Sequence, residues 1–165
     1  MIQDLHSPTC SGQGPNHPLV TIITVVRNDK DHIQETMQSA LAQSVVKVQY
    51  IVLDGASTDG TQDKIKEVIE RSDSGDIELL YRSAADEGMY DALNQALTLA
   101  KGEWISILNS GDTYCSTTAL ATLINNSHAG SDIIYGHSIA KHPEWDEEIR
   151  TSADVDKLQL APIFR

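Results

Sequence analysis

The chain alternates short apolar runs with longer segments in which apolar residues recur every three or four positions. The first run, 19–26, consists of Leu, Val, Ile and Thr, which is typical of a strand buried on both faces of a parallel sheet. Four further runs follow along the chain. The strands predicted in this way span 19–26, 50–53, 77–82, 104–108 and 132–135.

The segments between these runs carry apolar residues on one helical stripe, which predicts helices that pack one face on a sheet. We expect Asp31 and Gln34 to cap the first helix, and Lys101-Gly102 to end the third. The predicted stripes are Ile33, Met37, Ala40 and Leu41; Ile65, Val68 and Ile69; Met89, Leu93, Ala96, Leu97 and Ala100; and Leu120, Leu123 and Ile124.

This alternation of strands and helices predicts an α/β fold with a mainly parallel sheet. The chain has 165 residues, of which 40% are hydrophobic, so it is long enough and apolar enough for one domain with a real core. Its first 17 residues mix Ser, Gly, Pro and polar groups without periodicity. We therefore expect a disordered leader over 1–17 and the folded domain over 18–165.

The distribution of apolar residues and cysteines predicts a soluble, cytoplasmic protein. No apolar run approaches the roughly 20 residues that span a bilayer, and the N-terminus lacks the pattern of a signal peptide. Cys10 and Cys115 are far apart and belong to no C-x-x-C pair, so they indicate neither a disulfide framework nor a zinc site.

Charge narrows the class of ligand. The formal net charge is -12 at pH 7, with only 12 Lys and Arg residues, whereas nucleic-acid binding needs clustered cations that neutralise phosphates. We therefore expect no nucleic-acid partner. An acidic cleft suits metal ions better.

Three carboxylates follow the predicted strands. Asp54, Asp86 and Asp112 fall at or shortly after strand ends, where open α/β sheets bind their ligands. The small residues after Asp54 would let a planar ligand approach the backbone, and Asp54 could accept a hydrogen bond from a nucleobase imide. The same loop could equally be an Asx-turn and helix cap with no ligand.

Phosphate binding would need a metal ion in this chain. The sequence contains neither the G-x-G-x-x-G of dinucleotide sites nor the G-x-x-x-x-G-K-[ST] of P-loops. Mg2+ or Mn2+ can replace a glycine cradle, because these ions bind oxygen ligands and neutralise a leaving diphosphate. Asp112 is the best-placed ligand, although a lone Asp after a strand is often only a cap or turn residue.

Four loop motifs together resemble the family 2 glycosyltransferases. In chain order they are Thr-Ile-Ile-Thr-Val-Val-Arg-Asn, Asp-Gly-Ala-Ser-Thr-Asp-Gly-Thr, Asp-Glu-Gly-Met-Tyr-Asp-Ala-Leu-Asn and Leu-Asn-Ser-Gly-Asp. Each is moderately specific, but their order and spacing make chance agreement improbable. The resemblance runs from about Leu19 to the C-terminus.

The resemblance implies a GT-A fold, which is a Rossmann-like three-layer α/β/α arrangement with a mainly parallel central sheet. It also implies a nucleotide-diphosphate sugar donor, with UDP favoured, a divalent metal, and inversion at the anomeric carbon by direct displacement. Under the resemblance, Val25 and Arg27 border the base, Asp54 binds the uracil ring, and Asp86 and Gly88 line the nucleoside pocket. The remaining donor-site residues are Ser57, Asp91, Asn94, Asn109, Ser110 and Gly111, with Asp112 as the metal ligand.

Asp91 and Asn94 also have a simpler interpretation, as polar residues in the first turn of an amphipathic helix. The family's metal motif usually contains Asp-x-Asp, whereas here only Asp112 remains after Asn109, so metal binding without donor should be weak. Family members usually continue into an acceptor wall with a catalytic carboxylate. We therefore expect a C-terminally truncated enzyme, with no assignable base and little turnover.

The histidines and the acidic segment near the C-terminus are weaker candidates for metal binding or catalysis. The histidines form no metal-ligand motif: we expect His137 and His142 in a strand or loop and His128 in a turn. The acidic segment 144–148 is expected to be a solvated loop rather than a source of catalysis.

Three hypotheses remain open. The first is a sugar transferase acting on a saccharide or lipid-linked acceptor, in bacterial surface-polysaccharide assembly and with peripheral membrane association of the full-length protein. The second is a non-catalytic nucleotide-sugar-binding or interaction module, which would bind donor without turnover. The third is a nucleotidyltransferase, which ranks last because 27–30 supplies two cations but no glycine-rich phosphate loop.

Overall fold

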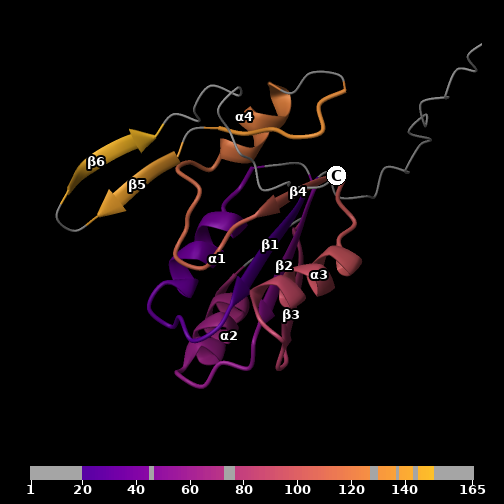
Figure 1. Cartoon of the computed structure of the whole chain (residues 1–165), viewed down its shortest axis with the longest axis vertical. Coiled ribbons are helices and arrows are strands. Elements are labelled where there is room, and N and C mark those ends of the chain that lie inside the picture. The colour runs from indigo at the N-terminus through magenta and orange to yellow at the C-terminus, as the bar shows by residue number, and fades with distance from the viewer. Residues whose placement is uncertain are drawn as a thin grey trace, which may run out of the picture.

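The computed structural model describes residues 20–44, 47–72, 77–126, 130–136, 138–142 and 145–150. The leader expected over 1–17 lies outside these ranges. The elements are β1 (Val20–Val26), α1 (Ile33–Leu41), β2 (Val48–Asp54), α2 (Thr61–Arg71), β3 (Ile77–Ser83), α3 (Met89–Leu99), β4 (Trp104–Ile107), α4 (Ala119–Asn125), β5 (Ser138–His142) and β6 (Trp145–Arg150) (Figure 1).

Four of these strands form one parallel sheet in the order β3-β2-β1-β4. Every residue of β1 and β2 is buried, as predicted for strands covered on both faces. The carboxyl ends of the four strands meet at the same edge of the sheet, because all of them run in the same direction. The predicted α/β class with a parallel sheet is confirmed.

Helices cover both faces of the sheet and complete three layers. Ile22 of β1 packs in one cluster with Ile33 and Met37 of α1, Ile65 of α2 and Leu120 of α4. The next residue of β1, Ile23, points to the other face, because side chains alternate along a strand. There it joins a second cluster with Ala92 and Ala96 of α3. Figure 1 shows α3 on one side of the sheet, with α1 and α2 on the other.

Two predicted helix ends were wrong. The N-cap of α1 is His32, which makes no side-chain cap, and Asp31 plays no part; instead the backbone amide of Ile33 donates to the Asp29 carbonyl at 3.2 Å. Helix α3 ends at Leu99, before Gly102. Gly102 is needed for space, since a Cβ there would lie 2.4 Å from the Thr21 amide nitrogen.

The predicted stripe of α3 was wrong in part. Ala92 and Ala96 are the buried residues, whereas Met89 and Leu97 are exposed. Small side chains let the helix backbone approach the sheet closely. Met89 and Leu97 are left toward solvent, whereas Leu93 packs against the same cluster as Ala92 and Ala96.

The chain after α4 departs most from prediction. The segment 132–135 has no regular secondary structure, and both Ile133 and Tyr135 are exposed. Instead β5 and β6 form an antiparallel hairpin, with Ser138 opposite Arg150. Residues 145–148, predicted as a solvated loop, therefore belong to β6.

Two further expectations concern histidines and membranes. His142 ends β5, while His128 and His137 lie outside the described residues. None of the described helices is long and apolar enough to cross a bilayer.

Candidate functional site

A polar hollow of about 290 Å³ lies at the carboxyl edge of the sheet. Its walls come from the end of β1 and the turn after it, the loop and first turn of α3, and the loop after β4. The lining residues are Val25, Val26, Arg27, Asp29, Asp86, Gly88, Met89, Ala92, Asn109 and Ser110.

The hollow brings together half of the residues that the sequence suggested. Those that line it are Val25, Arg27, Asp86, Gly88, Asn109 and Ser110. The other six are not among its lining residues: Asp54, Ser57, Asp91, Asn94, Gly111 and Asp112. Residues of the loops after β1, β3 and β4 are thus brought together, whereas no residue of the loop after β2 lines this hollow.

Arg27 is the one cation among the lining residues. Its side chain is exposed, and it makes no ion pair with any residue in the described ranges. Asp29 and Asp86 line the same hollow. A guanidinium without an internal partner can bind an anionic ligand or lie against the face of an aromatic base.

Asp86 is fixed at the start of α3. Its Oδ1 accepts a hydrogen bond from the Gly88 amide at 2.9 Å, which is the two-residue Asx-turn that Asp commonly forms. Gly88 has φ 119°, a conformation that favours glycine. The turn directs the Asp86 carboxylate over Gly55, at the start of the second loop.

Asp54 is almost wholly buried, with 2% of its surface exposed. Its carboxylate accepts hydrogen bonds from the Ser57 amide, at 3.1 and 3.3 Å, and from the Ser83 hydroxyl at 2.6 Å. These bonds fit the simpler interpretation of this loop, in which Asp54 holds a turn. A carboxylate offers about four acceptor positions, so a further donor remains chemically acceptable.

A second, smaller hollow of about 10 Å³ adjoins the first. The two share Asp86 and Ala92, and Asp54 lines only the smaller one. Arg82, which the sequence analysis missed, lies there as well. Its position at the end of β3 was the available signal, since this edge of the sheet collects ligand-binding residues.

The first two loops are tied together by hydrogen bonds. The Asn28 amide donates to Ser57 Oγ at 2.7 Å, and the Thr58 amide donates to Asn28 Oδ1 at 2.9 Å. The Asp29 amide donates to Thr61 Oγ1 at 2.8 Å. Ser57 therefore supports the wall behind Arg27 rather than facing the hollow.

Asp29 is a lining residue that sequence reasoning missed, although it directly follows Arg27 and Asn28 after a strand end. Its carboxylate lies 2.5 Å from His32 Nδ1. Partial burial acts to raise the pKa of Asp29, but the Ser110 hydroxyl and His32 outweigh it and lower the pKa overall. The carboxylate is therefore ionised at neutral pH.

The two helix residues of the third loop have different environments. Asp91 Oδ2 accepts hydrogen bonds from the Glu87 amide at 3.2 Å and from Gln95 Nε2 at 2.9 Å, as expected of a residue that closes the first turn of a helix. Asn94 is exposed. The simpler interpretation of Asp91 as a first-turn polar residue fits these bonds.

The fourth loop is a turn that presents Asn109 and Ser110. The Asp112 amide donates to the Asn109 carbonyl at 3.0 Å, and the Gly111 amide donates to Thr36 Oγ1 at 3.0 Å. Ser110 Oγ is buried and lies close enough to the Asp29 carboxylate to lower its pKa. The Asp112 side chain is exposed.

No three His, Cys, Asp or Glu side chains within the described ranges lie close enough together to hold a metal ion. The protein side chains alone therefore do not make a complete metal site in this part of the chain. A hard cation here would need oxygen ligands from elsewhere, such as phosphate oxygens and water.

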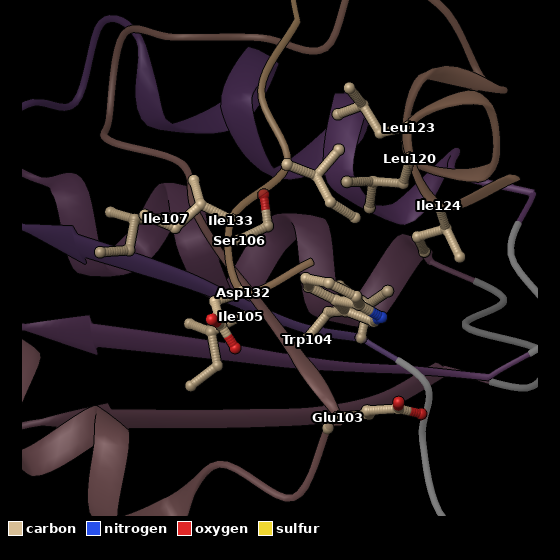
Figure 2. A pocket seen from close by; sticks show the side chains of 13 residues that line it. Glu103, Trp104, Ile105, Ser106, Ile107, Leu120, Leu123, Ile124, Asp132 and Ile133 are labelled. Carbon is tan, nitrogen blue, oxygen red and sulfur yellow. The ribbon is translucent and has the colours of Figure 1, made fainter. Parts of the chain in front are cut away.

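A separate apolar hollow of about 260 Å³ lies beside β4 (Figure 2). Trp104 and Ile105 of β4, Leu120 and Ile124 of α4, and Ile133 line it. Glu103, Ser106 and Asp132 also line it. The polar hollow is the better candidate for chemistry because it lies at the carboxyl ends of the parallel strands, where α/β sheets bind their ligands.

Comparisons with known proteins place the chain among glycosyltransferases. Over 107 residues the chain is 37% identical to the Escherichia coli UDP-Glc:alpha-D-GlcNAc-diphosphoundecaprenol beta-1,3-glucosyltransferase WfaP. The match covers 65% of this chain and 40% of WfaP. The chain thus spans less than half the length of this curated relative.

Two solved structures share the fold. A mannosyltransferase from Pyrobaculum calidifontis, in complex with GDP-Man and Mn2+, aligns with a TM-score of 0.58 and 27% identity over 67% of this chain and 32% of its own. Staphylococcus aureus TarS, in complex with UDP-GlcNAc, aligns with a TM-score of 0.54 and 22% identity over 64% of this chain and 31% of its own. The second likeness shows the fold alone.

The model of the family described as glycosyl transferase family 2 matches residues 21–163. That range takes in all four strands of the parallel sheet except the first residue of β1, and every loop around the polar hollow. The chain therefore belongs to glycosyl transferase family 2, on the GT-A fold.

Proposed function

We propose that this chain is the donor-binding part of a glycosyltransferase that takes a sugar from a nucleotide-diphosphate donor, with UDP as the nucleotide. The observation that carries the proposal is the convergence of Arg27, Asp86, Asn109 and Ser110 on one hollow at the carboxyl edge of a parallel sheet. The donors named for two relatives, UDP-Glc for WfaP and GDP-Man for the Pyrobaculum calidifontis mannosyltransferase, support a nucleotide sugar.

The two adjoining hollows suggest how a nucleotide would lie. The base lies over Asp86 and Ala92, which line both hollows. Its polar edge donates a hydrogen bond to the remaining acceptor position of Asp54. Val25 and Arg27 border the base and Gly88 the ribose. Ser57 supports the base-binding loop from behind, and Asp91 and Asn94 support the donor site from α3.

The diphosphate then lies toward the loop that follows β4. Asn109, Ser110 and Gly111 border it in this proposal. Asp112 would hold Mn2+ or Mg2+ together with diphosphate oxygens and water, and the cation would neutralise the leaving diphosphate. With a single carboxylate, metal binding is expected to depend on the nucleotide.

The transfer step is proposed to invert the anomeric carbon by direct displacement. Such a step requires a base that takes a proton from the acceptor hydroxyl. None of the described residues is assigned that role. The diphosphoundecaprenol-linked acceptor in the name of WfaP supports a lipid-linked saccharide as acceptor. Our proposal places this step in polysaccharide biosynthesis, at the cytoplasmic face of a membrane.

A second candidate is a non-catalytic nucleotide-sugar-binding module. It is favoured by the absence of any three-residue acidic or histidine cluster in the described part of the chain. The two candidates differ in turnover of a UDP-sugar, not in binding.

Calorimetric titration with UDP, in Mn2+ and after chelation, tests the proposal. We expect dissociation constants between micromolar and low millimolar, a loss on chelation, and at least about tenfold weakening in Arg27→Ala. The control is Arg71→Ala, which removes an exposed arginine at the C-terminal end of α2 that lines neither hollow. Equal affinity in both variants, or no binding by a folded chain, would contradict the proposal.

A further inference from the structure

We infer that Gly55 is a positioning residue of the donor site, because its missing side chain leaves the space in which the Asp86 carboxylate rests. The inference rests on the proposed function and deepens it. Gly55 does not line either polar hollow. It acts through Asp86, which lines both.

The space above Gly55 is already occupied. A Cβ built on Gly55 would lie 2.8 Å from Asp86 Oδ2 and 3.4 Å from Asp86 Cγ, and also 3.4 Å from Arg27 Cδ. Real Cβ atoms essentially never approach another heavy atom within 3.0 Å. The second loop therefore meets the carboxylate of the third loop and the side chain of the first at this one glycine.

Backbone conformation does not explain the glycine. Its φ lies outside the left-handed region, in contrast to Gly60 and Gly88. The Gly55 amide donates to the Val26 carbonyl at 2.9 Å, so the position is fixed against the end of β1. This φ does not require glycine, so the approach of Asp86 is what requires the absence of a side chain.

An added methyl group would move a side chain rather than the backbone. The closest atom is the end of the Asp86 carboxylate, which can swing away by rotation about its side-chain bonds. That rotation would break the hydrogen bond from the Gly88 amide to Asp86 Oδ1 and push the carboxylate into the space of the ligand. The fold should survive while the donor site is altered.

Gly102 provides a matched control. A Cβ there would meet backbone atoms, at 2.4 Å from the Thr21 nitrogen and 2.7 Å from the Val20 carbon, at the opposite end of β1. Gly102→Ala should therefore lower stability and leave nucleotide affinity unchanged in the molecules that remain folded. Gly55→Ala should lower nucleotide affinity and leave stability almost unchanged.

The experiment is a double-mutant cycle in UDP affinity on the full chain with Mn2+. We expect Gly55→Ala and Asp86→Ala each to weaken UDP about tenfold, and the double variant to bind no more weakly than Asp86→Ala alone, because removing the carboxylate removes the clash. The melting temperature of Gly55→Ala should stay within about 3 °C of the parent, and that of Gly102→Ala should fall by more than about 5 °C.

The outcomes separate the inference from the proposed function. If Asp86→Ala binds UDP like the parent, the proposed donor site itself is wrong. If Asp86→Ala is weakened and Gly55→Ala is not, or if the two losses simply add, Gly55 does not act through Asp86. A large loss of stability in Gly55→Ala would also overturn the inference, because it would mean that the backbone moves.

Discussion

Asp29, which lines the polar hollow, makes a hydrogen bond with the ring of His32. The hydrogen bond to Asp29, and then its negative charge, raise the pKa of His32 above its ordinary value of 6.5. A raised histidine pKa favours the folded state below pH 6.5, and the effect fades as the pH rises through the folded-state pKa. Because His32 is exposed, solvent screens this contribution to the free energy of unfolding. The shift should therefore be measured as a change in the titration midpoint of His32.

We therefore predict that His32 titrates above pH 6.5 in an NMR titration of its ring protons, and that Asp29→Asn moves the midpoint down toward 6.5. Asp31 and Glu35 also raise this pKa, so part of the shift should remain. Asp31→Asn is the matched control, with the smaller change expected. A larger change from Asp31→Asn than from Asp29→Asn would contradict the hydrogen-bonded pairing.

The residue scale also shows what the sequence could indicate about the site. Asp86 and Arg27 could be found because both follow predicted strands, where a parallel sheet gathers its ligand contacts. The burial of Asp54 and the closeness of Asp86 to Gly55 could not, because both depend on contacts between loops that are far apart in sequence.

Among the elements, α1 best illustrates how the apolar pattern determines packing. Ile33, Met37 and Ala40 recur at helical spacing and are all buried against the same face of the sheet. The stripe was predictable from the sequence because the apolar residues at helical spacing are the ones that pack against β1 and β2. Its N-terminus was not, since a backbone carbonyl, that of Asp29, takes the place of the predicted Asp31 cap.

We predict that Met37→Ala lowers the free energy of unfolding by about 2–5 kcal/mol, because Met37 is 0% exposed and its removal leaves a cavity beneath the sheet. Gln38→Ala, on the exposed side of the same helix, should stay within about 0.5 kcal/mol. Chemical denaturation of both variants provides the measurement. Equal effects would mean that α1 does not pack as described.

The elements after α4 show where local pattern fails. The apolar segment 132–135 has the composition of a strand but lies beside β4 without joining a described sheet, whereas the charged segment from Trp145 to Arg150 pairs with β5. Pairing in a hairpin depends on a partner strand as much as on composition. The single-sequence pattern gives no direct information about that partner.

At the scale of the whole molecule, the two hollows lie at different parts of the sheet. The polar hollow lies at the carboxyl ends of the strands, and the apolar hollow lies along β4. The α/β class and the parallel sheet followed from alternation alone, while the family followed from four motifs in order and was confirmed by the family match over 21–163. The strand order β3-β2-β1-β4 could only come from the structure.

The most direct test of the donor-site proposal is to map UDP binding on the full chain by amide chemical-shift changes in NMR, with Mg2+ as the cation. We predict that the largest changes fall on Arg27, Gly88, Asn109 and Ser110, and that Trp104 and Leu120 beside the apolar hollow change little. Changes centred on Trp104 and Leu120, or spread evenly over the chain, would contradict a donor site at the carboxyl edge of the sheet.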